Sequence, residues 1–154
     1  MFAEDGKGNV GVETKSFRVI PPTVAGTNIA KGRPATASSF DPYNGNFTPG
    51  QATDGDYATR WSSSWTDNEW IQVDLGSQKS FTTVQLVWES AFAKGYRIQT
   101  SNDGSSWTTA TEVTNGDGNV DTLNVNGSAR YVRVQGVTRG TGYGYSLYEL
   151  GVFA

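Results

Sequence analysis

The sequence predicts an all-β domain of the sandwich or jelly-roll kind. Thr, Ser, Val, Gly and aromatic residues are plentiful while Leu is scarce, and this composition favours strands and turns over helices. Short segments of alternating apolar and polar residues recur between turn signals, and no segment keeps a helical period. Many short strands separated by Gly- and Asn-containing turns are typical of β-sandwiches and jelly rolls.

The expected strands follow the alternating segments in chain order. They cover residues 71–75, 84–88, 96–99 and 131–134, with a last strand over 147–153. The turn signals between them are Leu75-Gly76-Ser77, Ser101-Asn102-Asp103-Gly104, Asn115-Gly116-Asp117-Gly118 and Asn126-Gly127. Apolar alternation indicates burial. The residues expected in the core or its lid are Trp61, Trp70, Ile71, Val73, Leu75, Trp107, Val132 and Val134.

Composition excludes several classes of function. The 154 residues suffice for one domain and a short extra segment. There is no Cys, which excludes disulfides and thiol catalysis, and no His, the commonest general base and metal ligand. The net charge of -3 and the lack of a Lys/Arg run argue against nucleic acid as a partner. No apolar run approaches the roughly 18 residues needed to cross a bilayer, so no membrane partner is expected.

A domain boundary is expected at residue 27. Residues 21–27 form a Pro- and Gly-containing linker, and residues 5–19 form a turn leading into one strand, which cannot bury itself alone. This strand resembles the closing hairpin of immunoglobulin-like repeats in bacterial multidomain secreted enzymes. We therefore interpret residues 1–27 as the tail of a preceding immunoglobulin-like domain plus a linker, and residues 28–154 as the main module. The alternative is that the strand joins the sheet of the main module.

The first residues carry neither the basic start nor the apolar stretch of a signal peptide. Together with the resemblance of residues 5–19 to an immunoglobulin-like repeat, this favours an internal fragment of a secreted protein. We expect its signal to lie upstream and the module to be extracellular.

Six motifs follow one another in order between Asn28 and Ala154. They are residues 28–39 (NIAKGRPATASS), 52–63 (ATDGDYATRWSS), 70–76 (WIQVDLG), 96–107 (YRIQTSNDGSSW), 130–134 (RYVRV) and 144–150 (GYSLYEL). Together they resemble discoidin, or factor V/VIII C-type, domains, and most closely the family 32 carbohydrate-binding modules. The pairing of Trp88-Glu89 with residues 139–146 is similar to members attached to enzymes that act on glucans and chitosan.

The resemblance implies both a fold and a role. The fold would be an eight-stranded jelly-roll β-sandwich with its ligand loops at one end. The role would be that of a non-catalytic carbohydrate-binding module, which targets a covalently attached bacterial glycoside hydrolase to a polysaccharide. We expect the module to be a monomer.

An oxygen-rich loop at Asp54-Gly55-Asp56 suggests a cation. Gly permits the sharp bend, and Ca²⁺ takes six to eight oxygen ligands. In the family, such a loop and a Glu near the last strand hold a structural Ca²⁺. Carried over, the ligands would be the carbonyls of Gln51, Asp56 and Tyr148, the side chains of Asp54 and Glu149, and both oxygens of Thr59. The alternative is an Asx turn whose carboxylates only cap backbone donors.

Two loops supply candidate sugar-binding residues. Trp65 lies among small polar residues and Tyr143 lies between glycines, and both contexts suit an exposed ring. Aromatic faces pack against the C–H surfaces of sugars, while planar polar side chains bind the hydroxyls. By resemblance to the glucan- and chitosan-binding members, the ligand positions fall on Arg60, Trp65, Glu89 and Tyr143, with Asp41 near a further acidic one.

The ligand stays open between chitosan and a β-glucan. Galactose-binding members commonly use a His, which this chain lacks. Glu89 could accept the ammonium group of glucosamine, but a carboxylate also accepts hydrogen bonds from neutral hydroxyls.

Two other functions compete with sugar binding. A glycosidase would need two carboxylates across a cleft, and the available ones are Asp41, Asp67, Glu69, Glu89 and Glu112. An adhesion module for protein, membrane or other glycans would use apolar loop side chains, for which Phe47 and Phe92 are candidates.

Overall fold

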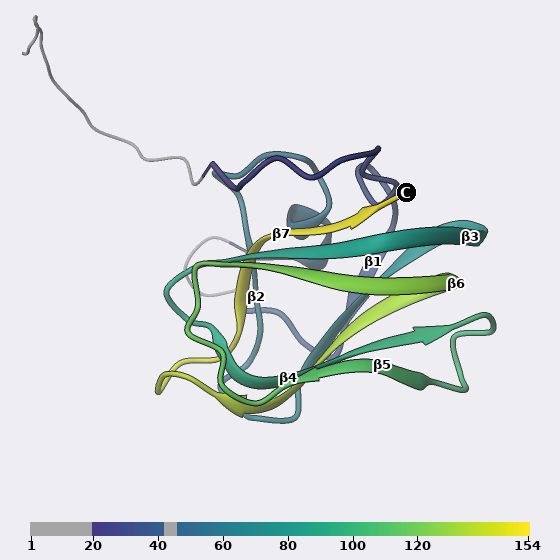
Figure 1. The fold of residues 1–154 in the computed structure, drawn as a ribbon. Coiled ribbons are helices and arrows are strands. Elements are labelled where there is room, and N and C mark those ends of the chain that lie inside the picture. Colours follow the sequence, from purple (N-terminus) through teal and green to yellow (C-terminus); the bar gives the residue numbers. More distant parts are fainter. Residues whose placement is uncertain (1–19, 42–45) are drawn as a thin grey trace, which may run out of the picture.

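The computed structural model describes residues 20–41 and 46–154 and shows an antiparallel β-sandwich (Figure 1). Its elements are β1 (Ala35–Ala37), the 3-10 turn η1 (Pro49–Ala52), β2 (Trp61–Ser62), β3 (Trp70–Trp88), β4 (Ala93–Ser101), β5 (Thr108–Val113), β6 (Val120–Arg139) and β7 (Ser146–Phe153). The all-β jelly-roll prediction is confirmed. Within the described ranges, no helix is long and apolar enough to span a membrane.

Two long strands connect the layers of the sandwich. β3 and β6 pair over most of the length of β3, from Trp70 opposite Gln135 to Val87 opposite Val120, with two register shifts. The first half of β3 lies between β1 and the second half of β6, which continues to β4 and β5. The second half of β3 lies between the first half of β6 and β7, which continues to β2. Figure 1 shows β7, β3 and β6 side by side in one layer, with β4 and β5 in the other.

The continuity of β3 and β6 explains why the described residues form seven strands where eight are expected. The turn signals at Leu75-Gly76-Ser77 and Asn126-Gly127 do not end strands. Gly76 lies inside β3 with φ of +92°, where the register with β6 shifts between Asp74 and Lys79. Gly127 lies inside β6 opposite Phe81, next to a second register shift. Glycine here permits a bend that carries one strand from one layer into the other.

The core lies between the two layers and confirms most of the expected burial. The buried apolar side chains include Trp61, Ile71, Val73, Leu75, Val84, Leu86, Tyr96, Ile98, Val132, Val134, Leu147 and Leu150. Each large apolar side chain removed from water contributes about 1.5–3 kcal/mol to folding. This core holds the strand ends rigidly, which matters because the loops at one end of the sandwich carry the candidate site.

The expectation that Trp107 belongs to the core is wrong. Trp107 and Trp70 are both half-buried on the outer face of the β4–β6 layer. The guanidinium of Arg133 lies 4.0 Å from the ring centroid of Trp107 and 4.1 Å from that of Trp70. A Trp beside a segment of alternating apolar residues can therefore lie on the outer face of a sheet, where a cationic side chain stacks on its ring.

The residues just before the module contact the sandwich. Thr27 and Ala154 exchange backbone hydrogen bonds of 3.0 Å in both directions, and Asn28 pairs with Phe153. The side chain of Gln85 donates to the carbonyl of Pro22 at 3.0 Å. The strand expected within residues 5–19 lies outside the described residues.

Candidate functional site

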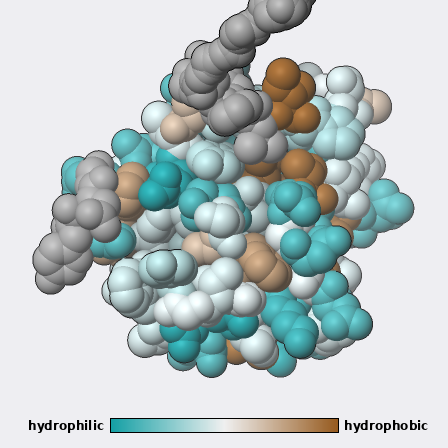
Figure 2. Space-filling view, turned by 90° about the vertical axis from the view of Figure 1, so that its left-hand side faces the viewer, coloured by the Kyte–Doolittle hydropathy of each residue, from teal (hydrophilic) through white to brown (hydrophobic). Residues whose placement is uncertain are grey.

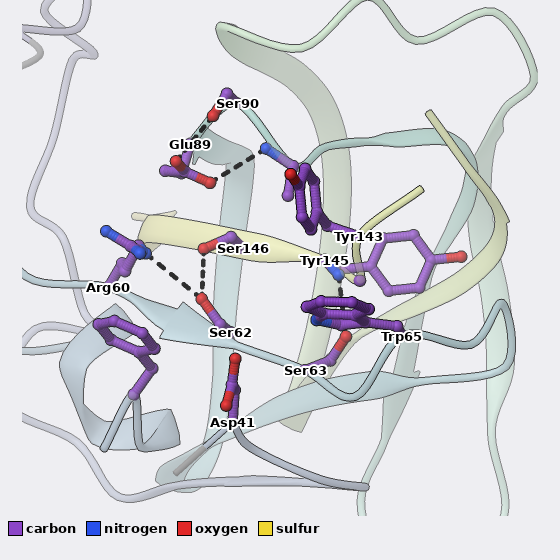
Figure 3. A pocket seen from close by; sticks show the side chains of 13 residues that line it. Asp41, Arg60, Ser62, Ser63, Trp65, Glu89, Ser90, Tyr143, Tyr145 and Ser146 are labelled. Atoms are coloured by element: carbon purple, nitrogen blue, oxygen red, sulfur yellow. Dashed lines mark hydrogen bonds between the residues drawn. The ribbon is translucent and has the colours of Figure 1, made fainter. Parts of the chain in front are cut away.

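The structure brings the five predicted sugar-binding residues, Asp41, Arg60, Trp65, Glu89 and Tyr143, around one pocket. We call it the loop pocket; its volume is about 240 Å³, and its lining is completed by Phe47, Ser62, Ser63, Ser90, Ala91, Gly144, Tyr145 and Ser146. Figure 3 shows Glu89 and Ser90 at one edge, Asp41 at the opposite edge, Arg60 on one side and the aromatic rings on the other. A pocket of this size suits one sugar unit, since sites for drug-sized ligands start at roughly 300 Å³.

Trp65 and Tyr143 present the exposed aromatic surface of the pocket. Their side chains are 56% and 60% exposed, among the highest values for large apolar residues in the described ranges. The two rings pack edge to face, with centroids 5.2 Å apart and planes at 87°. This contact restrains both rings, so that a face remains available for a sugar without much further loss of side-chain freedom.

Arg139 holds the two aromatic loops together. Its Nε donates to Oδ1 of Asp67 at 2.8 Å, and its Nη1 donates to the carbonyl of Trp65 at 2.9 Å. The same Nη1 lies 3.5 Å from the carbonyl of Tyr143. The hydrogen bond from Arg139 holds the pKa of Asp67 below its usual value, so the ion pair persists in mild acid.

Glu89 supplies a negative charge at the edge of the pocket. Burial alone would raise the pKa of Glu89, but hydrogen bonds from the Ser90 hydroxyl (2.7 Å) and the Ala91 amide (3.0 Å) outweigh it. The nearby charge of Arg60 acts in the same direction, and the resulting pKa lies below the usual range of Glu. The carboxylate is therefore ionised at neutral pH and held in place by its neighbours.

Arg60 is fixed by an aromatic ring. Its guanidinium carbon lies 4.1 Å from the ring centroid of Phe47, and its Nε donates to the hydroxyl of Ser62 at 3.4 Å. This stacking keeps the planar group at the side of the pocket, with its donors near the edge.

Hydroxyl groups and one buried ring form the floor of the pocket. The hydroxyls of Ser62 and Ser146 lie 2.6 Å apart, and the Ser146 hydroxyl donates to the carbonyl of Trp61. Tyr145 is buried and its hydroxyl donates to the carbonyl of Asp67 at 2.6 Å. The amide of Tyr145 donates to the hydroxyl of Ser63 at 2.8 Å. β2, β7 and the aromatic loops are thereby linked beneath the site.

The carboxylates proposed for a glycosidase are largely engaged elsewhere. Glu69 accepts hydrogen bonds from the hydroxyls of Ser38, Ser39 and Thr66. Asp67 pairs with Arg139, and Glu112 pairs with Arg97 at 3.1 Å on the outer sheet. Of the five candidates, Asp41 and Glu89 line the loop pocket.

The two candidates for apolar adhesion residues do not project as spikes. Phe47 is half-buried beneath Arg60, and Phe92 packs against the core. Figure 2 shows the loop end of the sandwich as mostly hydrophilic and intermediate residues, with small separate hydrophobic areas among the coloured residues.

The predicted calcium ligands gather at a second place, between η1 and β7. The hydroxyl of Thr59 lies near three acceptors: Oδ2 of Asp54, the Asp56 carbonyl (3.1 Å) and the Gln51 carbonyl (3.4 Å). A hydroxyl has one hydrogen and cannot satisfy three acceptors. Glu149 lies beside this group on β7, next to Tyr148, and its Oε2 accepts from the amide of Gly55 at 3.0 Å.

Two buried oxygens near this group have no hydrogen-bond partner: Oε1 of Glu149 and Oε1 of Gln51. Burial raises the pKa of Glu149 to about 8, and the charges of Asp54 and Asp56 add to this rise. Unpaired buried oxygens beside converging acceptors fit a hard cation. The described residues hold no metal-binding cluster of three or more acidic, His or Cys side chains, so such a cation would depend mainly on carbonyl and hydroxyl oxygens.

Asx turns also occur in this loop. Oδ1 of Asp54 accepts from the amide of Asp56, and Oδ1 of Asp56 accepts from the amide of Ala58, both at 2.9 Å. These caps use one oxygen of each carboxylate. Oδ2 of Asp54 faces Thr59 instead, so the turns and a cation site are compatible.

Sequence reasoning missed several residues of the loop pocket. Ser62, Ser63, Ser90 and Ser146 carry no signal that separates a lining hydroxyl from an ordinary loop serine. The position of Arg139 before a Gly-rich segment marks a loop start, but its contacts with Asp67 and Trp65 span more than 70 residues of sequence and depend on the fold.

Comparison with known proteins agrees with this geometry. The family model of the F5/8 type C domain matches residues 34–150. Chitosan-binding module 1 from a chitosanase/glucanase of Paenibacillus sp. IK-5 is 44% identical, with a TM-score of 0.78 over 83% of this chain and 99% of that one. Module 2 of the same enzyme, solved in complex with chitotriose, is 41% identical, with a TM-score of 0.77 over 82% of this chain and 100% of that one.

A relative of much greater length matches part of the chain. The polysaccharide lyase 8 family protein HylA of Enterococcus faecalis is 37% identical over 95 residues, which are 58% of this chain and 7% of that protein. The match thus spans a small fraction of a large protein. CpGH89CBM32-5 from Clostridium perfringens shares the fold, with a TM-score of 0.75 at 24% identity over 83% of this chain and 100% of that one.

Proposed function

The chain belongs to the F5/8 type C (discoidin) family as a non-catalytic carbohydrate-binding module, and on this premise we propose that its loop pocket binds chitosan-type polysaccharide. The observation that carries this proposal is the ionised carboxylate of Glu89 at the edge of a pocket whose exposed surface is formed by Trp65 and Tyr143. The rings would pack against the C–H face of a glucosamine unit. Glu89 would accept its ammonium group through a charge-assisted hydrogen bond.

A neutral β-glucan is the second candidate ligand. Arg60 and the pocket hydroxyls can bind neutral sugar hydroxyls without any ammonium group. Chitosan is favoured because the ionised carboxylate of Glu89 lines the pocket, where the ammonium group of a glucosamine unit would complement its charge and a neutral sugar would not. The similarity to two chitosan-binding modules from Paenibacillus sp. IK-5, one of them solved in complex with chitotriose, supports the same choice.

Isothermal titration with chitosan oligomers and with laminarin oligomers tests the choice. Glu89→Gln keeps the shape and hydrogen-bonding capacity of the side chain but removes its charge. We expect this variant to lose most of its chitosan affinity and to keep any laminarin affinity. Glu112→Gln on β5 removes the same charge far from the pocket and is the matched control. Chitosan binding that is unaffected in Glu89→Gln contradicts the proposal.

The module would act as part of a larger secreted enzyme. A glycoside hydrolase domain in the same chain would gain from a module that holds it on its polysaccharide, since linkage raises the effective concentration of substrate. We expect the isolated module to be a monomer, to be extracellular in a bacterium and to release no reducing ends from chitosan or laminarin.

A structural Ca²⁺ between η1 and β7 is the other part of the proposal. The ligands would be the carbonyls of Gln51, Asp56 and Tyr148, the side chains of Asp54 and Glu149, and the oxygens of Thr59. The support is the set of converging acceptors around Thr59 and the unpaired Oε1 atom of Glu149. The ion would supply positive charge to a buried carboxylate and tie the loop to β7. Metal analysis of the purified protein tests this directly.

A further inference from the structure

A second pocket adjoins the loop pocket across the segment Glu89–Ser90. We call it the flanking pocket; its lining residues are Trp88, Glu89, Ser90, Phe92, Asp117, Gly118, Asn119 and Tyr148. Glu89 and Ser90 line both pockets, so a ligand that leaves the loop pocket over these two residues enters the flanking pocket directly. The flanking pocket is more open and has a volume of about 380 Å³.

The walls of the flanking pocket are fixed by backbone and ring contacts. The amide of Trp88 donates to the carbonyl of Asn119 at 2.8 Å, and the Trp88 indole donates to Asp121 at 3.0 Å. Gly118 and Asn119 both adopt positive φ, of +80° and +60°. The ring of Phe92 packs closely against Gly118, where an added Cβ would lie 3.2 Å from the ring. The pocket therefore exists before any ligand arrives.

The charge of the flanking pocket has one sign. Asp117 is exposed, Glu89 is shared with the loop pocket, and the eight lining residues include no Lys or Arg. Its other polar groups are a Ser hydroxyl, a Tyr hydroxyl and an Asn amide, which suit sugar hydroxyls, and Phe92 and Tyr148 supply apolar ring surface. An uncompensated carboxylate beside ring surface is complementary to a cationic sugar.

We propose that the flanking pocket is a second subsite, which binds the sugar unit next to the one in the loop pocket, with Asp117 accepting the ammonium group of that second unit. This inference rests on the proposed function, since it assumes that the first unit occupies the loop pocket. We therefore expect the module to bind an oligomer more tightly than a single amino sugar and to bind the ammonium groups of two successive sugar units.

Titration with glucosamine, its β-linked dimer and its trimer tests the second subsite. The wild type should bind the dimer and trimer more tightly than glucosamine. Asp117→Asn keeps the shape of the side chain and should lower trimer affinity about two- to fivefold, the effect of one exposed charge pair, while glucosamine affinity stays unchanged. Glu112→Gln is the control for the loss of one negative charge.

The other outcomes would overturn either the second subsite alone or both proposals. If Glu89→Gln loses chitosan binding but Asp117→Asn binds the trimer as the wild type does, the second subsite is wrong and the proposed function stands. Equal losses for glucosamine and trimer in Asp117→Asn would also overturn it, because Asp117 would then act on the first unit. If the wild type binds none of these ligands, both proposals fail. As an independent measurement, amide resonances of residues 117–119 should shift with trimer and not with glucosamine.

Discussion

Arg139 donates hydrogen bonds to one carboxylate oxygen of Asp67 from two of its own atoms, the backbone amide (3.1 Å) and Nε (2.8 Å). The guanidinium also donates through Nη1 to the backbone carbonyl of Trp65. Arg139 therefore connects the end of β6 to a loop more than 70 residues earlier. The spacing of the two exposed rings therefore depends on a side chain that does not line the loop pocket.

Replacing Arg139 should weaken sugar binding without removing a ligand contact. Arg139→Ala frees the Trp65 and Tyr143 loops from each other, so we expect a several-fold loss of affinity and a small change in Tm. Arg139→Lys should recover little, because an ammonium cannot reproduce the planar fork. The control is Arg97→Ala, which breaks an exposed ion pair with Glu112 far from the loops. Wild-type affinity in Arg139→Ala, measured by titration, would show that the rings are positioned by other contacts.

Trp65→Ala should remove the stacking surface while leaving the fold intact. Trp65 is more than half exposed and contributes little to the core, so Tm should stay close to the wild-type value. The loss of ring contact should cost about 1–2 kcal/mol of binding free energy, roughly tenfold in Kd. The wild-type Kd is expected between about 1 mM and about 1 μM, the range for a shallow site. If Trp65→Ala and Tyr143→Ala both bind as the wild type does, the loop pocket is not the sugar site.

Chitosan binding should persist in mild acid. Burial opposes ionisation of Glu89, but the Ser90 hydroxyl, the Ala91 amide and the charge of Arg60 hold its pKa below the usual 4.5. A carboxylate with a lowered pKa stays mostly ionised down to the usual pKa of Glu, so lowering the pH from neutral to about 4.5 should not reduce affinity, and affinity should decline only below that. Titrations across this range check the expectation, with Glu89→Gln lacking the acid step. A decline that begins well above pH 4.5 would count against an ionised Glu89 as the ammonium acceptor.

Removal of calcium should destabilise the module. An ion present at about 100 times its Kd adds about 2.7 kcal/mol to the free energy of unfolding if it binds only the native state. Chelation should therefore lower Tm clearly, and added Ca²⁺ should restore it. Thr59→Val replaces the central hydroxyl with a methyl group of similar shape and should abolish the response to chelator. An identical melting curve with and without chelator, in protein that contains no metal, would refute the calcium site.

The sequence predicted the strands well because apolar alternation reports directly on burial. The segments around Ile71, Val84, Ile98 and Val132 all lie in strands with buried faces. It did not predict that β3 and β6 continue past Gly76 and Gly127, because a Gly that bends a strand and a Gly that ends one look alike in a single sequence. Trp107 was misplaced for a related reason: its cover is Arg133, a long-range partner that local alternation does not reveal.

The residues of the candidate site also fall into those that the sequence predicted and those that it did not. Exposed rings in Gly- and Ser-rich loops identify Trp65 and Tyr143, and resemblance to a family adds Arg60, Glu89 and Asp41. All five lie around the loop pocket. The flanking pocket was not foreseen, because it forms where the β3–β4 connection meets the loop before β6, and Asp117 looked like an ordinary turn residue. The sheet topology decides which segments are neighbours, and therefore which residues line the flanking pocket.

The shared strands β3 and β6 also determine how the chain can reach its native state. Neither layer is complete until both strands have paired, and the pairing of Val87 with Val120 closes a loop of the chain that contains β4 and β5. Such non-local pairing slows folding relative to helical domains of similar size. Because both layers depend on the pairing of β3 with β6, we expect them to unfold in a single cooperative transition. No intermediate in which one layer is folded and the other unfolded should be populated.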